Sequence, residues 1–359
     1  MARLSARYPD ARVHWVGGHR GLEGQVVPEA GWPLTRLWLR SLRTVDLSLA
    51  TLLDPIRLAA SVPQALALLA RWRPDVVYTT GGYVAIPVLV AAALLRIPSL
   101  LWEGNRLAGR SVRVTGRLAT VRAVTFAPTA ARLPAPTFVT GTPIRDLARL
   151  DRAAARARLG LEEGVPVLLV FGGSQAVRTL NTAVSEAIGE LVHGCAVVHI
   201  TGPAGAAAAQ ADRAALPRSL RGRYLPFPFL GADMEAALVA ADLLVGRAGS
   251  STLAEAAALG LPMVVVPYPH AAAHQEANAE ELVRAGGGLL VRDEDLDGRA
   301  LLEAGDLLLD ERLAAMRPGA RSLGRPGAAE ACLQLLEALA AGRPLPEAAG
   351  VEALTREAA

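Results

Sequence analysis

Two glycine-rich segments in the second half of the chain have the composition of phosphate-binding turns. A Gly-Gly-Ser-Gln segment at 172–175 follows the apolar run 165–171, and a Gly-Arg-Ala-Gly-Ser-Ser segment at 246–251 follows the apolar run 243–245. Glycine lets the backbone approach a ligand closely, and the N-terminus of a following helix offers free N–H groups to an anion. An ordinary turn with a serine helix cap would look the same, so each segment alone leaves both interpretations open.

Polar side chains that suit a sugar nucleotide follow these segments. Glu255 lies about one helical turn past the second segment, where its carboxylate can accept hydrogen bonds from a vicinal diol such as a ribose; a solvent-exposed helix carboxylate is the alternative. Gln275 and Asn278 follow the apolar run 263–266, and their amides suit the hydroxyls of a neutral sugar. The histidines and the two cysteines have no metal-ligand spacing, so the sequence predicts no metal site.

The elements that must position these residues alternate between strands and helices. The expected strands are apolar throughout, as is typical of parallel sheets covered by helices on both faces. They are 12–16, 75–78, 97–102, 123–126 and 137–140 in a first series, and 165–171, 196–200, 243–245 and 263–266 in a second.

This arrangement predicts an α/β protein of two Rossmann-like domains whose parallel sheets face each other across a cleft. The expected domains are residues 1–148 and 149–341. The segment 342–359, which is rich in proline and glycine at its start, is expected to be a disordered tail.

Composition narrows the function classes. Of 359 residues, 52% are hydrophobic and 20% are charged, which excludes a disordered chain. The net charge of +3 is small for this length, so we expect no nucleic-acid partner. No uninterrupted apolar run reaches the roughly 18 residues of a membrane span.

Taken in order, the motifs resemble the MurG family of glycosyltransferases, which have the GT-B fold. Gly-Gly-Ser-Gln, Arg-x-Gly-(x)5-Glu and His-Gln-x-x-Asn resemble the C-terminal domain of that family. Four landmarks of its N-terminal domain precede them, at 74–77, 81–84, 103–105 and 141–145. Each motif is weak alone, but seven in this order, spread over about residues 12–335, are specific.

The resemblance implies an activity. Members of the family transfer N-acetylglucosamine (GlcNAc) from UDP-GlcNAc to undecaprenyl-diphosphate-linked muramyl-pentapeptide (lipid I), with inversion at the anomeric carbon and without a metal or another cofactor. They complete the second lipid intermediate of peptidoglycan synthesis (lipid II). The chain is therefore expected to be peripheral on the cytoplasmic face of the cell membrane.

The resemblance also implies site residues. Leu230 would present its backbone to the uracil, and Asn105 and Arg145 would reach the donor from the first domain. The full donor set is Asn105, Arg145, Gly173, Ser174, Gln175, Leu230, Ser250, Ser251, Thr252, Leu253, Ala254, Glu255, Gln275 and Asn278. The acceptor diphosphate would lie at Gly81, Gly82 and Tyr83.

The start of the chain departs from the family pattern. The family begins with a strand and a GGTGGH loop whose histidine is the usual candidate base, and the first βα unit is expected to be missing here. The run 17–19 is Gly-Gly-His, but its surroundings match the family's second strand, so His19 is expected to be a loop residue. The catalytic base is therefore left unassigned, with Glu103 as one candidate. Two explanations fit this short start, a start codon assigned too late and a truncated gene, and the first is favoured because losing the first strand would expose the centre of the sheet. This sequence is expected to bind UDP but to transfer GlcNAc poorly.

An apolar and basic region at 34–69 is a candidate membrane contact. Arg36, Arg40 and Arg43 would share one face of a helix, beside Trp38, Leu53 and Ile56. Apolar side chains with arginines around them suit an anionic leaflet, where each basic residue adds about 1 kcal/mol. The alternative is a core-facing amphipathic helix with a solvated arginine face.

Two further functions stay open from the sequence. The first is another UDP-sugar transferase, or a non-hydrolysing epimerase, of the same architecture. The second is a non-catalytic UDP-sugar-binding protein, because the family's first loop is not found.

Overall fold

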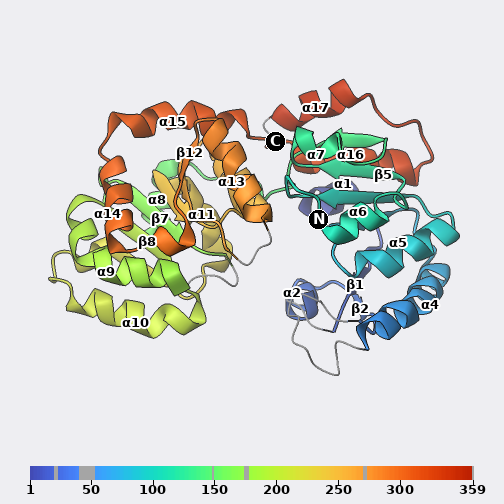
Figure 1. Ribbon diagram of the computed structural model, residues 1–359, viewed down its shortest axis with the longest axis horizontal. Coiled ribbons are helices and arrows are strands. Elements are labelled where there is room, and N and C mark those ends of the chain that lie inside the picture. Colours follow the sequence, from blue (N-terminus) through green and yellow to red (C-terminus); the bar gives the residue numbers. More distant parts are fainter. Residues whose placement is uncertain (20–22, 40–52, 148, 174–177, 270–272, 358–359) are drawn as a thin grey trace. The chain divides into compact units, whose positions relative to one another are not determined.

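The computed structural model describes residues 1–19, 23–39, 53–147, 149–173, 178–269 and 273–357. The chain forms two compact units (Figure 1). Unit 1 contains Met1–Gly141 and Ala328–Thr355, and unit 2 contains Thr142–Gly327 and Arg356–Ala359.

Unit 2 is built on a six-stranded parallel sheet of order β12-β11-β10-β7-β8-β9. Because every pair is parallel, the carboxyl ends of all six strands meet at one edge of the sheet. The strands are β7 (Val167–Phe171), β8 (Ala196–Ile200), β9 (Tyr224–Phe227), β10 (Leu243–Gly246), β11 (Met263–Val265) and β12 (Gly288–Leu290).

Helices cover both faces of this sheet (Figure 1). Leu168 and Val170 pack on one face against α9 (Arg178–Gly194), α10 (Gly202–Ala215) and α14 (Gly298–Leu307). Val167 and Leu169 pack on the other face against α8 (Arg152–Leu159), α11 (Met234–Ala240), α12 (Ser250–Leu259) and α13 (His274–Arg284). Since successive strand residues point to opposite faces and both faces are covered, the strands are apolar throughout.

The helix α15 (Glu311–Ser322) contributes buried side chains to both of these cores. The described part of unit 2 also contains three short 3-10 helices: η1 (Arg221–Arg223), η2 (Gly231–Asp233) and η3 (Asp293–Asp295).

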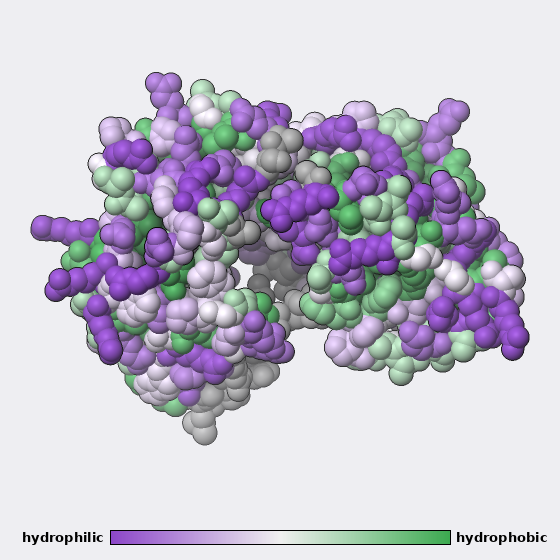
Figure 2. Space-filling model, turned by 180° about the vertical axis from the view of Figure 1, so that it is seen from behind, coloured by the Kyte–Doolittle hydropathy of each residue, from purple (hydrophilic) through white to green (hydrophobic). Residues whose placement is uncertain are grey.

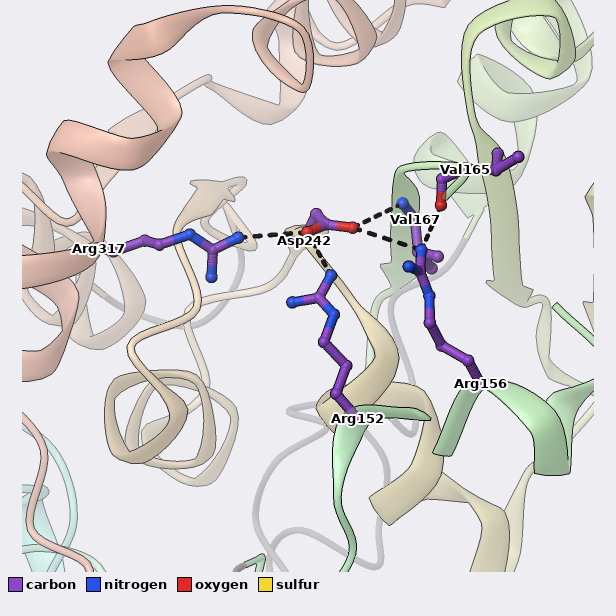
Figure 3. Close-up of polar contacts among 6 residues, drawn as sticks. All are labelled: Arg152, Arg156, Val165, Val167, Asp242 and Arg317. Atoms are coloured by element: carbon purple, nitrogen blue, oxygen red, sulfur yellow. Dashed lines mark hydrogen bonds and ion pairs between the residues drawn. The ribbon is translucent and has the colours of Figure 1, made fainter. Parts of the chain in front are cut away.

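A single carboxylate joins the amino edge of the sheet to two helices (Figure 3). Asp242 directly precedes β10, and its Oδ2 accepts a hydrogen bond from the backbone N–H of Val167 at 3.0 Å. It also forms ion pairs with Arg152, with Arg156 at 3.7 Å and with Arg317 at 3.3 Å. Asp242 therefore ties α8 and α15 to the central strands β7 and β10.

Unit 1 has a four-stranded parallel sheet of order β3-β4-β5-β6 and a parallel pair, β1-β2. The strands are β1 (Trp15–Gly17), β2 (Leu34–Arg36), β3 (Val77–Thr79), β4 (Ser99–Glu103), β5 (Val121–Val124) and β6 (Thr137–Val139). Between Met1 and Gly141, the helices in the described residues are α1 (Ala2–Arg7), α2 (Glu23–Glu29), α4 (Asp54–Trp72), α5 (Ala85–Leu94), α6 (Arg110–Thr115) and α7 (Ala127–Ala130). Leu37 and Leu39 share one core with Val77 of β3 and Val88 of α5, so this core joins the strand pair to the larger sheet.

The end of the chain differs from the expected boundaries. Instead of belonging to the second domain and a disordered tail, α16 (Ala328–Ala340) and α17 (Ala348–Arg356) return to unit 1. Leu335 of α16 and Val351 of α17 are fully buried in a core with Leu100 and Val121. The linker between the two helices is rich in proline and glycine, but each helix carries an apolar stripe. These stripes cover a face of the sheet that would otherwise be exposed, so the segment packs onto unit 1.

The parallel α/β architecture predicted for both halves is confirmed. The strands expected at 165–171, 196–200, 243–245 and 263–266 form as β7, β8, β10 and β11, with ends that differ by at most two residues. The strands β2, β9 and β12 were not predicted, because at three or four residues they are too short to show a strand pattern in the sequence.

We predict that Asp242→Asn destabilises unit 2 by about 2 kcal/mol, because it leaves partly buried guanidinium groups without their counter-charge. Circular dichroism during urea unfolding measures the loss. All five tryptophans lie in unit 1, so tryptophan fluorescence reports on that unit and should not change. Asp233→Asn, which breaks the half-exposed pair with Arg158, is the matched control and should cost about 0.5 kcal/mol or less. Equal effects of the two substitutions would contradict this role for Asp242.

Candidate functional site

The carboxyl edge of the unit 2 sheet gathers the turns predicted to bind the donor. β7 ends at Phe171 and is followed by Gly173, whose φ of +73° favours glycine. A Cβ at Gly246, the last residue of β10, would lie 2.6 Å from the carbonyl oxygen of Phe171. Only glycine therefore fits between these two central strands. Ser174 and Gln175 lie outside the described residues.

Helix α12 starts at this edge, and among the described residues no side chain caps its first backbone N–H groups. Gly249 is its N-cap residue and makes no side-chain hydrogen bond to the helix. The first N–H groups of a helix have no partner within the helix, so those of Ser250, Ser251 and Thr252 suit an anion. Leu253 is buried in the core, and Ala254 is partly buried next to it.

Glu255 lies one turn into α12 and is only 7% exposed. Its Oε1 accepts a hydrogen bond from Nε of Arg145 at 2.7 Å. Burial raises the pKa of Glu255, and the guanidinium of Arg145 opposes this rise. Arg145 was expected to reach the donor from the first domain, but the structure places it in unit 2 because the chain crosses to that unit at Thr142.

The two amides assigned to the sugar are engaged within unit 2. Oε1 of Gln275, on α13, accepts a hydrogen bond from the backbone N–H of Tyr268 at 2.9 Å. Asn278 is fully buried, and its Nδ2 donates to the carbonyl of Ala248 at 3.1 Å. In this structure both side chains therefore hold loops at the carboxyl edge. Leu230, assigned to the uracil, is buried as the N-cap residue of η2.

An arginine that the sequence analysis gave no role lies among these loops. Arg247 is 4% exposed and directly follows β10. Its Nη1 lies 2.5 Å from Oδ1 of Asp293 and donates to the carbonyl of Val266 at 3.2 Å. Its guanidinium also lies 5.5 Å from the ring centroid of Tyr268, within cation–π range. A charged residue directly after a fully apolar strand was the signal that could have identified it.

The carboxyl edge of the unit 1 sheet carries the predicted acceptor residues. Gly81 and Gly82 follow β3 and both have φ of +80°, a conformation that L side chains rarely adopt. A Cβ at Gly81 would also lie 2.9 Å from a methyl group of Val112. Tyr83 comes next and packs against the core beside α5. The two glycines therefore form a tight turn with its backbone at this edge.

Glu103, the catalytic candidate, is buried at the end of β4 and is used by its own loop. Its Oε1 accepts hydrogen bonds from the backbone N–H of Asn105 at 2.9 Å and from Nδ2 of Asn105 at 3.0 Å. Its Oε2 accepts one from the backbone N–H of Gly109 at 2.8 Å. These contacts favour a positioning role, in which Glu103 holds Asn105, over proton transfer. His19 is exposed in a bend, where its backbone N–H donates a hydrogen bond to the carbonyl of Leu39.

The residues predicted to contact the membrane are arranged differently from expectation. Arg36 belongs to β2, so it cannot share a helix face with Arg40 and Arg43, which lie outside the described residues. Trp38, Leu53 and Ile56 are 46%, 45% and 59% exposed. Hydrophobic residues reach the visible surface of both units between hydrophilic ones (Figure 2), so exposure alone does not mark a membrane contact.

Within the described ranges, no group of three or more His, Cys, Asp or Glu side chains is placed to hold a metal ion. Among the helices described, none is both long and apolar enough to cross a bilayer.

Comparison with known proteins gives a consistent result. The model of the glycosyltransferase family 28 N-terminal domain matches residues 2–124, and that of the family 28 C-terminal domain matches residues 167–331. The chain is 38% identical over 347 residues to the UDP-N-acetylglucosamine–N-acetylmuramyl-(pentapeptide) pyrophosphoryl-undecaprenol N-acetylglucosamine transferase of Desulforudis audaxviator, covering 94% of this chain and 92% of that protein. It is 42% identical over 328 residues to the protein of the same name from Nocardioides sp., covering 88% and 86%.

Solved structures show the same likeness. MurG of Acinetobacter baumannii matches with a TM-score of 0.73 at 27% identity, covering 94% of this chain and 93% of that one. A protein described as a UDP-N-acetylglucosamine 2-epimerase from Listeria monocytogenes matches with a TM-score of 0.68 at 16% identity, covering 95% and 92%. At that identity the second likeness concerns the fold alone.

The raised pKa of Glu255 predicts a specific pH dependence. The folded chain binds a proton at this carboxyl more tightly than the unfolded chain does. The free energy of unfolding therefore falls as pH rises from the ordinary value of 4.5 to the raised value in the fold. Glu255→Gln removes this loss, so its stability relative to the wild type should increase over that window.

Urea unfolding followed by circular dichroism, from about pH 4 to about pH 7, measures this difference. Glu280→Gln on α13, where the glutamate is half exposed, is the control. A difference between Glu255→Gln and the wild type that stays constant with pH would contradict the prediction.

Proposed function

This chain belongs to the MurG family within glycosyltransferase family 28, and we propose that it transfers GlcNAc from UDP-GlcNAc to lipid I, forming lipid II in peptidoglycan synthesis. The observation that carries the proposal is the pairing of a buried carboxylate, Glu255, with the uncapped start of the same helix. A ribose diol and a diphosphate need these two features about one helical turn apart.

In the reaction, a hydroxyl of the acceptor attacks the anomeric carbon of GlcNAc while the bond from that carbon to the UDP oxygen breaks. The attacking hydroxyl loses its proton to a base, and UDP leaves with the bonding electrons. Negative charge develops on the diphosphate, which the first N–H groups and the dipole of α12 would stabilise. The glycine turns after β7 and β10 would let the backbone contact the same diphosphate.

The other site residues keep the roles that the resemblance implies, as part of the proposal. Gly81, Gly82 and Tyr83 would contact the acceptor diphosphate, since they form a glycine turn at the carboxyl edge of unit 1. Asn105 is held by Glu103 and would be presented by that contact. Gln275 and Asn278 would shape the sugar pocket through the loops that they hold.

The lipid-linked acceptor requires access to a membrane surface, and unit 1 offers one candidate. Trp38, Leu53 and Ile56 are exposed, and the guanidinium of Arg57 lies 5.8 Å from the Trp38 ring. Apolar side chains beside an arginine suit an anionic leaflet. We propose that this face binds the cytoplasmic surface of the cell membrane peripherally.

The activity is tested directly with labelled UDP-GlcNAc and a short-chain lipid I. Transfer of label to the lipid supports the proposal. UDP binding without transfer would indicate a non-catalytic binding protein, and conversion of UDP-GlcNAc without acceptor would indicate an epimerase.

We predict that Glu255→Ala weakens the binding of UDP by about 1–3 kcal/mol, because the ribose hydroxyls lose a buried acceptor. Calorimetry with UDP measures the change. Glu280→Ala, which removes a half-exposed glutamate from α13, should bind UDP as the wild type does. Unchanged affinity in folded Glu255→Ala would remove Glu255 from the site.

We predict that Ile56→Asp reduces binding to vesicles containing anionic lipid by about tenfold or more, because burying an isoleucine in the bilayer interface is worth about 1.5–3 kcal/mol. Co-sedimentation with vesicles measures binding. Leu309→Asp in unit 2, at a leucine that is 70% exposed, is the matched control and should bind normally. If both variants bind alike, the membrane surface lies elsewhere.

A further inference from the structure

Unit 2 contains a buried hydrogen-bonded chain to which the proposed function gives no role. His199 of β8 is 1% exposed, and its Nδ1 lies 2.9 Å from the hydroxyl of Tyr224 on β9. Its Nε2 lies 3.0 Å from Oδ1 of Asn181, in the first turn of α9. Nδ2 of Asn181 donates to the carbonyl of Thr201, at the end of β8, at 2.9 Å.

The hydrogen positions in this chain follow from its ends. The carbonyl of Thr201 can only accept, so the amide of Asn181 directs Nδ2 toward it and Oδ1 toward His199. Nε2 of His199 therefore carries the hydrogen, and Nδ1 accepts from the Tyr224 hydroxyl. Burial lowers the pKa of His199 to about 4, so the ring is neutral at neutral pH and keeps this arrangement.

The chain holds the start of one particular helix. Helix α9 begins at Arg178, three residues after Gln175 of the predicted phosphate-binding turn. Asn181 ties its first turn to β8 on one side. On the other side, Oγ1 of Thr179 donates to Oδ2 of Asp293 at 3.3 Å, and Asp293 pairs with Arg247. The first turn of α9 is thus fastened to strands on both sides of β7.

Packing leaves Asn181 little freedom. A Cβ at Gly205 of α10 would overlap Nδ2 of Asn181 and lie 3.2 Å from Cβ of Thr201. An apolar core would bury this region without the cost of satisfying three polar side chains. The hydrogen-bonded chain instead gives the side chains of Tyr224, His199 and Asn181 a single orientation.

We propose that His199 is a positioning residue for the donor: through Asn181 it fixes the first turn of α9, the helix that follows the predicted phosphate-binding turn along the chain. This inference rests on the proposed function. Tyr224 completes the device by directing the imidazole ring of His199.

The test compares steady-state kinetics and UDP affinity in variants of the full chain. Asn181→Ala and His199→Leu should raise KM for UDP-GlcNAc and Kd for UDP by about tenfold or more, with kcat and the KM for the acceptor changed much less. His199→Gln, which keeps a donor toward Asn181, should restore most of the affinity. Thr182→Ala, the next residue on α9 with its hydroxyl on the helix surface, is the matched control.

Two smaller changes test the inference if His199→Leu does not fold. Tyr224→Phe removes one hydroxyl from the hydrogen-bonded chain. Gly205→Ala displaces Asn181 from the α10 side without substituting any residue of the hydrogen-bonded chain. Both should raise KM for UDP-GlcNAc. If they lower the melting temperature but leave KM and the Kd for UDP within about twofold of wild type, the chain only supports the core and the inference is overturned. A wild-type chain that binds no UDP would overturn the proposed function, and this inference with it.

Discussion

In a parallel sheet that helices cover on both faces, polar side chains gather mainly at the two ends of the strands. In unit 2 the amino ends carry Asp242, whose contacts with α8, α15 and β7 hold the layers together. The carboxyl ends carry the glycine turns, Arg247 and the start of α12 with Glu255. The architecture thus separates the groups that stabilise the unit from those that can meet a ligand, and both sets depend on the register of β7 with β10.

Buried charges in the two units illustrate different uses of desolvation. Arg122 of unit 1 is buried among the carbonyls of Gly116, Ala119 and Pro136, which fix it in place as part of the fold. The charge of Glu255 is only partly compensated, because its partner Arg145 is itself nearly half exposed. Burial therefore still raises the pKa of the Glu255 carboxyl. Retaining an acid where its ionised form is disfavoured costs stability, which is expected where the acid serves a ligand rather than the fold.

Within each unit, the described contacts support the candidate site residues of that unit. In unit 2, Asn278 and Arg247 hold the loops after β10 and β11, while His199 and Asn181 hold the helix after β7. In unit 1, Glu103 organises the loop after β4. These side chains form hydrogen bonds mainly with backbone groups and so hold the loops in place. The groups that the loops offer to a substrate are therefore largely backbone N–H and carbonyl groups, whose positions are set by the strand ends.

Sequence patterns alone predict the strand-and-helix alternation, the glycine turns and the order of motifs that identifies the family. These features are local: apolar runs, left-handed glycines such as Gly81 and helix starts need only near neighbours in the chain. Tertiary structure alone decided that α16 and α17 close unit 1, that Arg145 pairs with Glu255, and that Asp293 meets Arg247. Such partners come from strands and helices far apart in sequence, and which of them become neighbours is set by strand order and packing, which residue types do not specify.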